Sequence, residues 1–172
     1  MLGSKPLIAL FAFIIFYGTV TPMLGRLFLT DISSVFGRDV TLTGRTLVWE
    51  QLVPVAMGRP ILGHGFGGFW TTEKREVYDI SGSHNGYLDT ILDLGFVGLI
   101  LFSIFILSSC QKAIKEMNYD FDGACFKICF FLMTVLHNIA ETSLENFASR
   151  LMAVVLLLVL STTATSYTRR GL

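Results

Sequence analysis

Four long apolar runs constrain this chain more than any other feature. Three of them, at 6–25, 94–111 and 151–168, contain no charged residue, and about 20 apolar residues suffice to cross a bilayer as a helix. The composition agrees, because 52% of the 172 residues are hydrophobic, 15% are charged and the mean hydropathy is +0.63. The sequence therefore predicts an all-α membrane protein with about four transmembrane helices, near residues 6–29, 86–110, 121–139 and 151–168.

Two of these predicted spans have unusual ends. The run at 121–139 is interrupted by Asp122 and Lys127, and a lysine there can extend its ammonium group to the membrane interface along its aliphatic stem. The first run follows Lys5, as in a signal peptide. Its apolar character continues to Leu29 without a small-x-small cleavage site, so the sequence predicts an uncleaved helix.

The segment between the first two spans, residues 30–85, is a long loop. Basic residues stand before the first span (Lys5), between the second and third (Lys112 and Lys115) and after the fourth, which places them on one side if all four runs cross. By the positive-inside rule that side is the cytoplasm and the loop lies opposite. The loop also carries several basic residues, so the bias is small.

Within the loop, residues 43–54 predict a short helix with Thr43 as its N-cap. The apolar residues Val48, Leu52 and Val55 recur at helical spacing, and we expect this helix to lie on the membrane surface or to pack on the spans. Arg45 and Trp49 are four residues apart and share one face.

Several patterns that suggest a ligand have simpler explanations. The glycines of 63–68 fit the dinucleotide pattern GxGxxG, but no strand precedes them, so a tight turn is favoured. The cysteines form no CxxC pair and are interpreted as packing thiols; they are Cys110, Cys125 and Cys129. His137 and Glu141, with Glu145 beyond, lack a further metal ligand at suitable spacing and suggest a polar lid or an interface turn. A formal net charge of zero gives no indication of nucleic-acid binding.

Three motifs in order carry a resemblance to a known family. Arg45 with Trp49 comes first, the turn Pro-Ile-Leu-Gly-His-Gly-Phe-Gly at 60–67 follows, and His84-Asn85 then precedes Gly95 and Gly98 in the pattern H-[NSQ]-x9-G-x-x-G. The region resembles the C-terminal catalytic part of the O-antigen ligase and polymerase superfamily. The run at 36–46 is most similar to the branch that makes exopolysaccharides. Residues 1–172 are accordingly interpreted as a single C-terminal membrane region.

The resemblance implies a metal-independent, cofactor-free, inverting glycosyltransferase in the bacterial inner membrane, with the loop at 30–85 in the periplasm. Its donor would be a glycan on undecaprenyl diphosphate, held among membrane lipids. The acceptor would be a lipid A-core sugar in a ligase, or a second lipid-linked repeat unit in a polymerase, and the sequence leaves these open. Because such enzymes have further spans with another arginine, we expect this chain to be truncated or to work with a missing N-terminal half.

The same resemblance assigns roles to individual residues. His84 is expected to act as the general base, since an imidazole with an ordinary pKa of ~6.5 is largely neutral near pH 7. Arg45 is expected to bind the diphosphate, because guanidinium grips phosphate oxygens in a bidentate fork. Asn85 and Trp49 are candidate substrate contacts, with a helix cap and an interface anchor as their respective alternatives. Gly95 and the second motif glycine, Gly98, are expected to permit close helix packing.

Another class of function remains open at this stage. The chain could be a non-catalytic membrane remnant or an accessory subunit of a polysaccharide export system. A transporter subunit is not favoured, because no predicted span has a charged residue near its centre.

Overall fold

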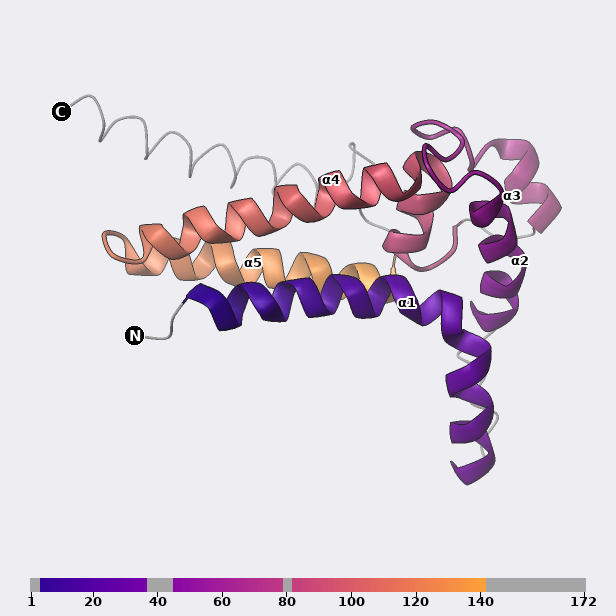
Figure 1. Cartoon of the computed structure of the whole chain (residues 1–172), viewed down its shortest axis with the longest axis horizontal. Helices are drawn as coiled ribbons and strands as arrows, with labels where there is room; N and C mark the ends of the chain where they lie inside the picture. Colours follow the sequence, from indigo (N-terminus) through magenta and orange to yellow (C-terminus); the bar gives the residue numbers. More distant parts are fainter. Residues whose placement is uncertain (1–3, 37–44, 79–81, 142–172) are drawn as a thin grey trace.

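The computed structural model describes residues 4–36, 45–78 and 82–141. Within these ranges the chain is helical with connecting turns and contains no strand, as the sequence predicted (Figure 1). The helices are α1 (Ser4–Phe36), α2 (Arg45–Gly58), α3 (Thr72–Tyr78), α4 (Gly86–Glu116) and α5 (Phe121–Ala140).

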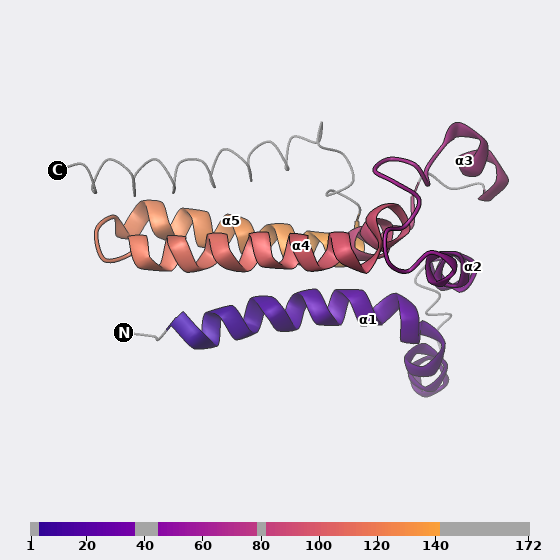
Figure 2. The ribbon, with the colours of Figure 1, turned by 45° about the horizontal axis from the view of Figure 1, so that its top comes forward.

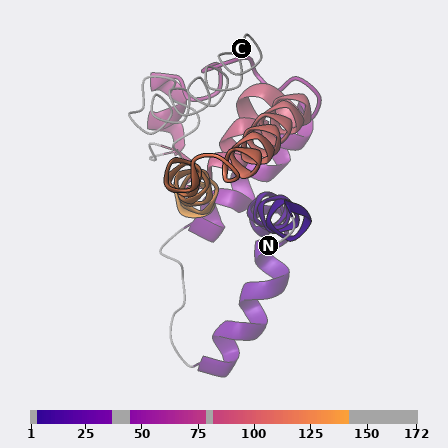
Figure 3. The ribbon, with the colours of Figure 1, turned by 90° about the vertical axis from the view of Figure 1, so that its left-hand side faces the viewer.

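Three helices form a bundle, which Figure 3 shows nearly end-on: α1, α4 and α5. Each of the three contacts the other two. Each is long and apolar enough to cross a membrane, over Lys5–Leu24, Gly86–Glu116 and Phe121–Ala140. A 20-residue helix is ~30 Å long, which matches the hydrocarbon thickness of a bilayer. The fourth predicted span, at 151–168, lies outside the described residues.

α1 bends within the predicted first span, residues 6–29. Pro22 stands inside the helix, where a proline removes one backbone hydrogen bond and its ring clashes with the preceding turn. Figure 1 shows α1 turning sharply away from the bundle beyond this region. The candidate span is Lys5–Leu24, and because the side chains beyond it lie outside the described part of the chain, the predicted end at residue 29 stays a prediction.

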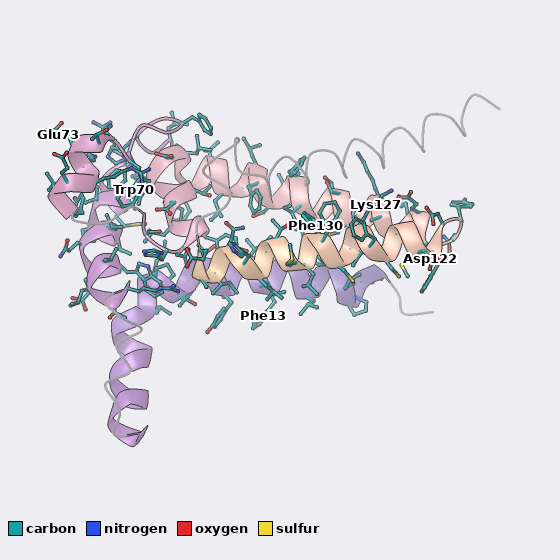
Figure 4. The ribbon with its side chains drawn as sticks, turned by 180° about the vertical axis from the view of Figure 1, so that it is seen from behind. Phe13, Trp70, Glu73, Asp122, Lys127 and Phe130 are labelled. Atoms are coloured by element: carbon teal, nitrogen blue, oxygen red, sulfur yellow. The ribbon has the colours of Figure 1, made fainter. Side chains whose placement is uncertain are left out.

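Apolar residues occupy both the inside and the outside of the bundle. Side chains buried between the three helices include Phe11, Ile14, Ile15, Ile106, Phe131 and Val135. Large apolar side chains also point outward, including Phe13, Phe16, Ile100, Leu101, Ile104 and Phe126; Figure 4 shows Phe13 directed away from the bundle. An apolar outer surface of this extent suits lipid and not water.

The end of the bundle that holds the N-terminus also holds the turn between α4 and α5 (Figure 1). Near this end, Lys127 contacts both carboxylate oxygens of Glu116 at 2.7 and 2.8 Å, with both side chains only 10% exposed. Lys127 thus reaches the last residue of α4 at this end of the bundle, and its expected extension to the membrane interface stays a prediction. Figure 4 labels Lys127 in this half of α5.

The predicted short helix of the loop is α2, which packs against α1 and α4 and crosses the opposite end of the bundle (Figure 2). It begins at Arg45 in the described part of the chain and continues past Pro54 to Gly58; Thr43, its predicted cap, lies outside that part. Leu52 is buried and Val48 and Val55 are half-buried, so the apolar face packs on the spans. The short helix α3 carries no buried residue.

Candidate functional site

Asn85 fastens the start of α4 to the bundle. Its side-chain oxygen accepts hydrogen bonds from the backbone N–H groups of Tyr87 and Leu88 at 3.1 and 2.9 Å, which makes it the N-cap of the helix. Its amide nitrogen donates to the carbonyls of Gly18 in α1 and Ile139 in α5 at 3.0 and 3.3 Å. The side chain is fully buried, and it joins all three bundle helices at one point. The expected contact of Asn85 with substrate stays a prediction.

His84 directly precedes this cap and takes an uncommon backbone conformation. Its φ of 53° is the only positive value among the described residues other than glycine, and such conformations cost about 1–3 kcal/mol and cluster at functional sites. The imidazole is 40% exposed, and its Nδ1 lies 3.3 Å from Oε2 of Glu141. The strained backbone thus places the ring at the surface beside a carboxylate, while the next residue is buried.

Glu141 brings His84 and Arg45 into one cluster. Its Oε1 accepts a hydrogen bond from the Arg45 guanidinium at 3.3 Å, across 96 residues of sequence. Its Oε2 contacts His84. Arg45 is the first residue of α2, His84 precedes α4 and Glu141 caps the C-terminus of α5. The two residues that the sequence selected for chemistry therefore meet through a carboxylate for which it predicted only a lid or a turn.

Trp49 connects α2 to the residue before His84. Its indole N–H donates to the carbonyl oxygen of Ser83 at 2.8 Å, and the side chain is 4% exposed. Ser83 is the residue before His84, and its hydroxyl also donates to the carbonyl of Asn85 at 2.9 Å. Trp49 therefore fixes the distance between α2 and the His84 turn. Its predicted contact with substrate is untested.

α4 is broken at Gly95, where the turn at 60–65 inserts. Gly95 has φ 65° and ψ −168°, a region open essentially to glycine alone. The backbone N–H groups of Phe96 and Val97, freed by the break, donate to the carbonyls of Pro60 and Ile61 at 2.7 and 3.2 Å. In return, the N–H groups of the turn bond to carbonyls of α4 before the break, as shown by His64 to Leu92 at 2.9 Å and Gly65 to Asp93 at 2.8 Å.

The motif glycines explain how this insertion is possible. A Cβ on Gly95 would collide with the carbonyl of Ile61, and a Cβ on Gly63 would lie 2.5 Å from the carbonyl of Asp93. A Cβ on Gly98 would collide with the Leu94 side chain of the preceding turn. Neither glycine therefore shows the expected close packing of two helices: Gly95 admits a loop, and Gly98 is crowded by a side chain of its own helix.

Two buried carboxylates of α4 accept hydrogen bonds from the loop residues between 67 and 83. Asp93 accepts hydrogen bonds from the backbone N–H groups of Gly67 and Phe69 at 3.1 and 2.9 Å. Asp89 accepts from the indole of Trp70 at 2.9 Å and from the backbone N–H of Ser83 at 3.3 Å. No role for these aspartates was expected from the sequence. Their positions could have predicted a role, because two carboxylates four residues apart at the start of an apolar run are costly to bury unless they have hydrogen-bond partners.

The cluster combines an orienting carboxylate, an imidazole and a guanidinium at the surface of one end of the bundle. If Nδ1–H of His84 donates to Glu141, then Nε2 carries the lone pair and can accept a proton. The Arg45 side chain is 26% exposed, so an anion can reach its guanidinium. Among the described residues, no group of three or more His, Cys, Asp or Glu side chains could hold a metal ion.

Fold and site together define a multi-pass, all-helical membrane protein with a polar cluster at one end of its bundle. The chain belongs to the O-antigen ligase family, whose sequence pattern matches residues 2–103, more than half of the chain. This confirms the resemblance found in the sequence.

Two curated relatives share part of this region. The exopolysaccharide production protein ExoQ of Rhizobium meliloti is 29% identical over 97 residues, which are 50% of this chain and 22% of that protein. An uncharacterized protein of Haemophilus influenzae is 27% identical over 116 residues, 62% of this chain and 29% of its own length. The chain thus spans less than a third of the length of either relative. No solved structure matches it significantly.

Proposed function

We propose that this chain forms the catalytic end of a membrane glycosyltransferase that builds a surface polysaccharide. A hydroxyl of an acceptor glycan attacks the anomeric carbon of a donor glycan on undecaprenyl diphosphate. The new C–O bond forms as the bond from the anomeric carbon to the diphosphate oxygen breaks, and the diphosphate leaves with the electron pair. The hydroxyl proton goes to His84.

The observation that carries this proposal is the Glu141 carboxylate between His84 and Arg45. Its contact with Nδ1 orients the imidazole and leaves Nε2 facing away from the carboxylate, ready to take a proton. A positioned general base contributes about 10²–10⁴-fold to a rate. The arrangement parallels the carboxylate–imidazole pairs that activate hydroxyl nucleophiles in other enzymes.

Arg45 supplies the second requirement, a cation for the departing diphosphate. Its guanidinium is part-exposed beside His84, so a diphosphate bound there would leave the attached sugar near the base. A well-placed donor to developing negative charge contributes ~3 kcal/mol to transition-state stabilisation. Asn85 and Trp49 are buried and bonded within the protein, so further contacts to the donor are expected from spans that precede this region in the family.

A periplasmic site is proposed mainly because the family resemblance implies it. Lys5, Lys112 and Lys115 belong to the end of the bundle with the N-terminus and the α4–α5 turn (Figure 1). His84 and Glu141 stand at the other ends of α4 and α5. By the positive-inside rule the lysines favour a cytoplasmic position for their end, but the basic residues of the loop, including Arg45, Arg59, Lys74 and Arg75, keep this bias small. The name of the Rhizobium relative supports an exopolysaccharide or a similar glycan as the product.

The test is polysaccharide production in a strain that lacks its own copy of the gene and carries the full-length protein. We expect His84→Ala and Arg45→Ala to abolish polymer while the protein remains in the membrane at wild-type levels. His137→Ala, the same change at an exposed histidine of α5, should leave production intact. Normal polymer from the His84→Ala strain would refute the proposal.

A further inference from the structure

Glu141 shares its carboxylate between two residues that the proposed reaction uses separately. Arg45 cannot give the same N–H groups to Glu141 and to a diphosphate. We propose that Glu141 holds the place of the diphosphate on Arg45 before the donor binds, and that donor binding shifts the carboxylate to His84 alone. This inference rests on the proposed function and assigns Glu141 as a positioning residue.

The geometry of the Arg45–Glu141 contact suits an exchangeable partner. Nη2 of Arg45 lies 3.3 Å from Oε1 of Glu141, and the Glu141 side chain is 49% exposed. Strong charge-assisted hydrogen bonds are shorter, at 2.7–2.9 Å. The Lys127–Glu116 pair of the same chain shows the permanent alternative, at 2.7 Å with both side chains 10% exposed. Exposed ion pairs are weak, so a diphosphate, which carries more charge than a carboxylate, can displace Glu141.

The position of Glu141 in the fold also favours movement. It caps the C-terminus of α5 with φ −147° and ψ 158°, and its backbone N–H bonds to the carbonyl of His137. The backbone is thereby anchored while the side chain extends beyond the helix. A carboxylate at a helix C-terminus is disfavoured by the helix dipole. The contacts with Arg45 and His84 offset that cost.

The exchange would order the steps of the reaction. Before the donor binds, the Arg45 cation draws part of the carboxylate charge away from His84. Once the diphosphate occupies Arg45, the imidazole is the one partner that remains to Glu141 among the described residues. Glu141 therefore orients the base fully when a donor is present for the acceptor to attack.

The test compares binding with turnover for the full-length protein in lipid nanodiscs. Farnesyl diphosphate serves as a sugar-free donor analogue for binding, and a lipid-diphosphate-linked sugar serves for transfer. We expect Glu141→Gln to bind farnesyl diphosphate about two- to fivefold more tightly, the range of an exposed ion pair. The same variant should transfer sugar at least ~10-fold more slowly, because the base has lost its orienting carboxylate.

Matched variants separate the outcomes. Glu73→Gln makes the same change on α3, at the edge of the molecule (Figure 4), and should alter neither measurement. Glu141→Ala also removes the charge and should tighten binding as Glu141→Gln does, so it stands in if the first variant is not recovered. Unchanged or weaker binding by charge-free Glu141 variants would overturn the exchange. Undiminished binding by Arg45→Gln would instead refute the diphosphate role of Arg45, and with it the proposed function.

Discussion

Replacing Gly95 by alanine is the sharpest test of how α4 and the loop support the site. The φ and ψ of 65° and −168° cost a residue with a Cβ about 1–3 kcal/mol. The new Cβ would also collide with the backbone of Ile61. Moving that backbone breaks the bonds from Phe96 to Pro60 and from Val97 to Ile61, each worth about 0.5–1.5 kcal/mol. The sum predicts that Gly95→Ala destabilises the protein by about 2–6 kcal/mol.

Heat-induced loss of monodisperse protein, followed by size-exclusion chromatography in detergent, measures this effect. Gly58→Ala is the control, because Gly58 ends α2 and a Cβ there meets nothing within 4 Å. At about 2–4 °C per kcal/mol, Gly95→Ala should lower the transition temperature by at least ~4 °C, and Gly58→Ala should leave it within ~1 °C. Equal temperatures for the two variants would show that the turn at 60–65 does not depend on the break in α4.

Three further tests concern supports at the cluster and a buried ion pair at the opposite end of the bundle. Asn85→Ala removes a cap and two bridging bonds, so it should cost about 2–4 kcal/mol in the same assay; a loss below 1 kcal/mol would contradict this. Lys127→Met should lower the free energy of unfolding by about 3–5 kcal/mol, because it leaves the Glu116 carboxylate unpaired. Adding Glu116→Leu should restore most of that stability. A double variant as unstable as Lys127→Met would refute the importance of this ion pair. Trp49→Phe loses the bond to Ser83 and should reduce polymer yield more than thermal stability, whereas parallel losses would make its role purely structural.

The sequence was sufficient to locate the three bundle helices and to select two side chains that the structure brings together. Apolar runs of helical length located α1, α4 and α5, and ordered motifs selected Arg45 and His84. The break at Gly95 could not be predicted, because an uncharged run reads as continuous helix. Only the bonds to Pro60 and Ile61, more than 30 residues earlier, make that break tolerable.

Long-range pairing explains the remaining differences. Glu141 contacts His84 and Arg45, which lie 57 and 96 residues earlier in the sequence. The spacing of residues within one helix cannot predict contacts over such distances. The lysine at 127 pairs with Glu116 because α4 and α5 form a hairpin, which is invisible when each run is judged alone. Asp89 and Asp93 carried a usable signal, since two carboxylates at the start of an apolar run need partners, but the loop groups that satisfy them lie far back in the sequence.

Glycosyl transfer by the purified full-length protein is the direct test of His84 as the general base. The measurement is the single-turnover rate from a lipid-diphosphate-linked sugar to an acceptor glycan, for wild type and His84→Gln, with donor binding measured alongside. We expect the rate to fall by at least ~100-fold while donor affinity stays within about threefold of wild type, because Arg45 still holds the diphosphate. A His84→Gln rate within about threefold of wild type would contradict it, since an effect so small is far below that of a general base.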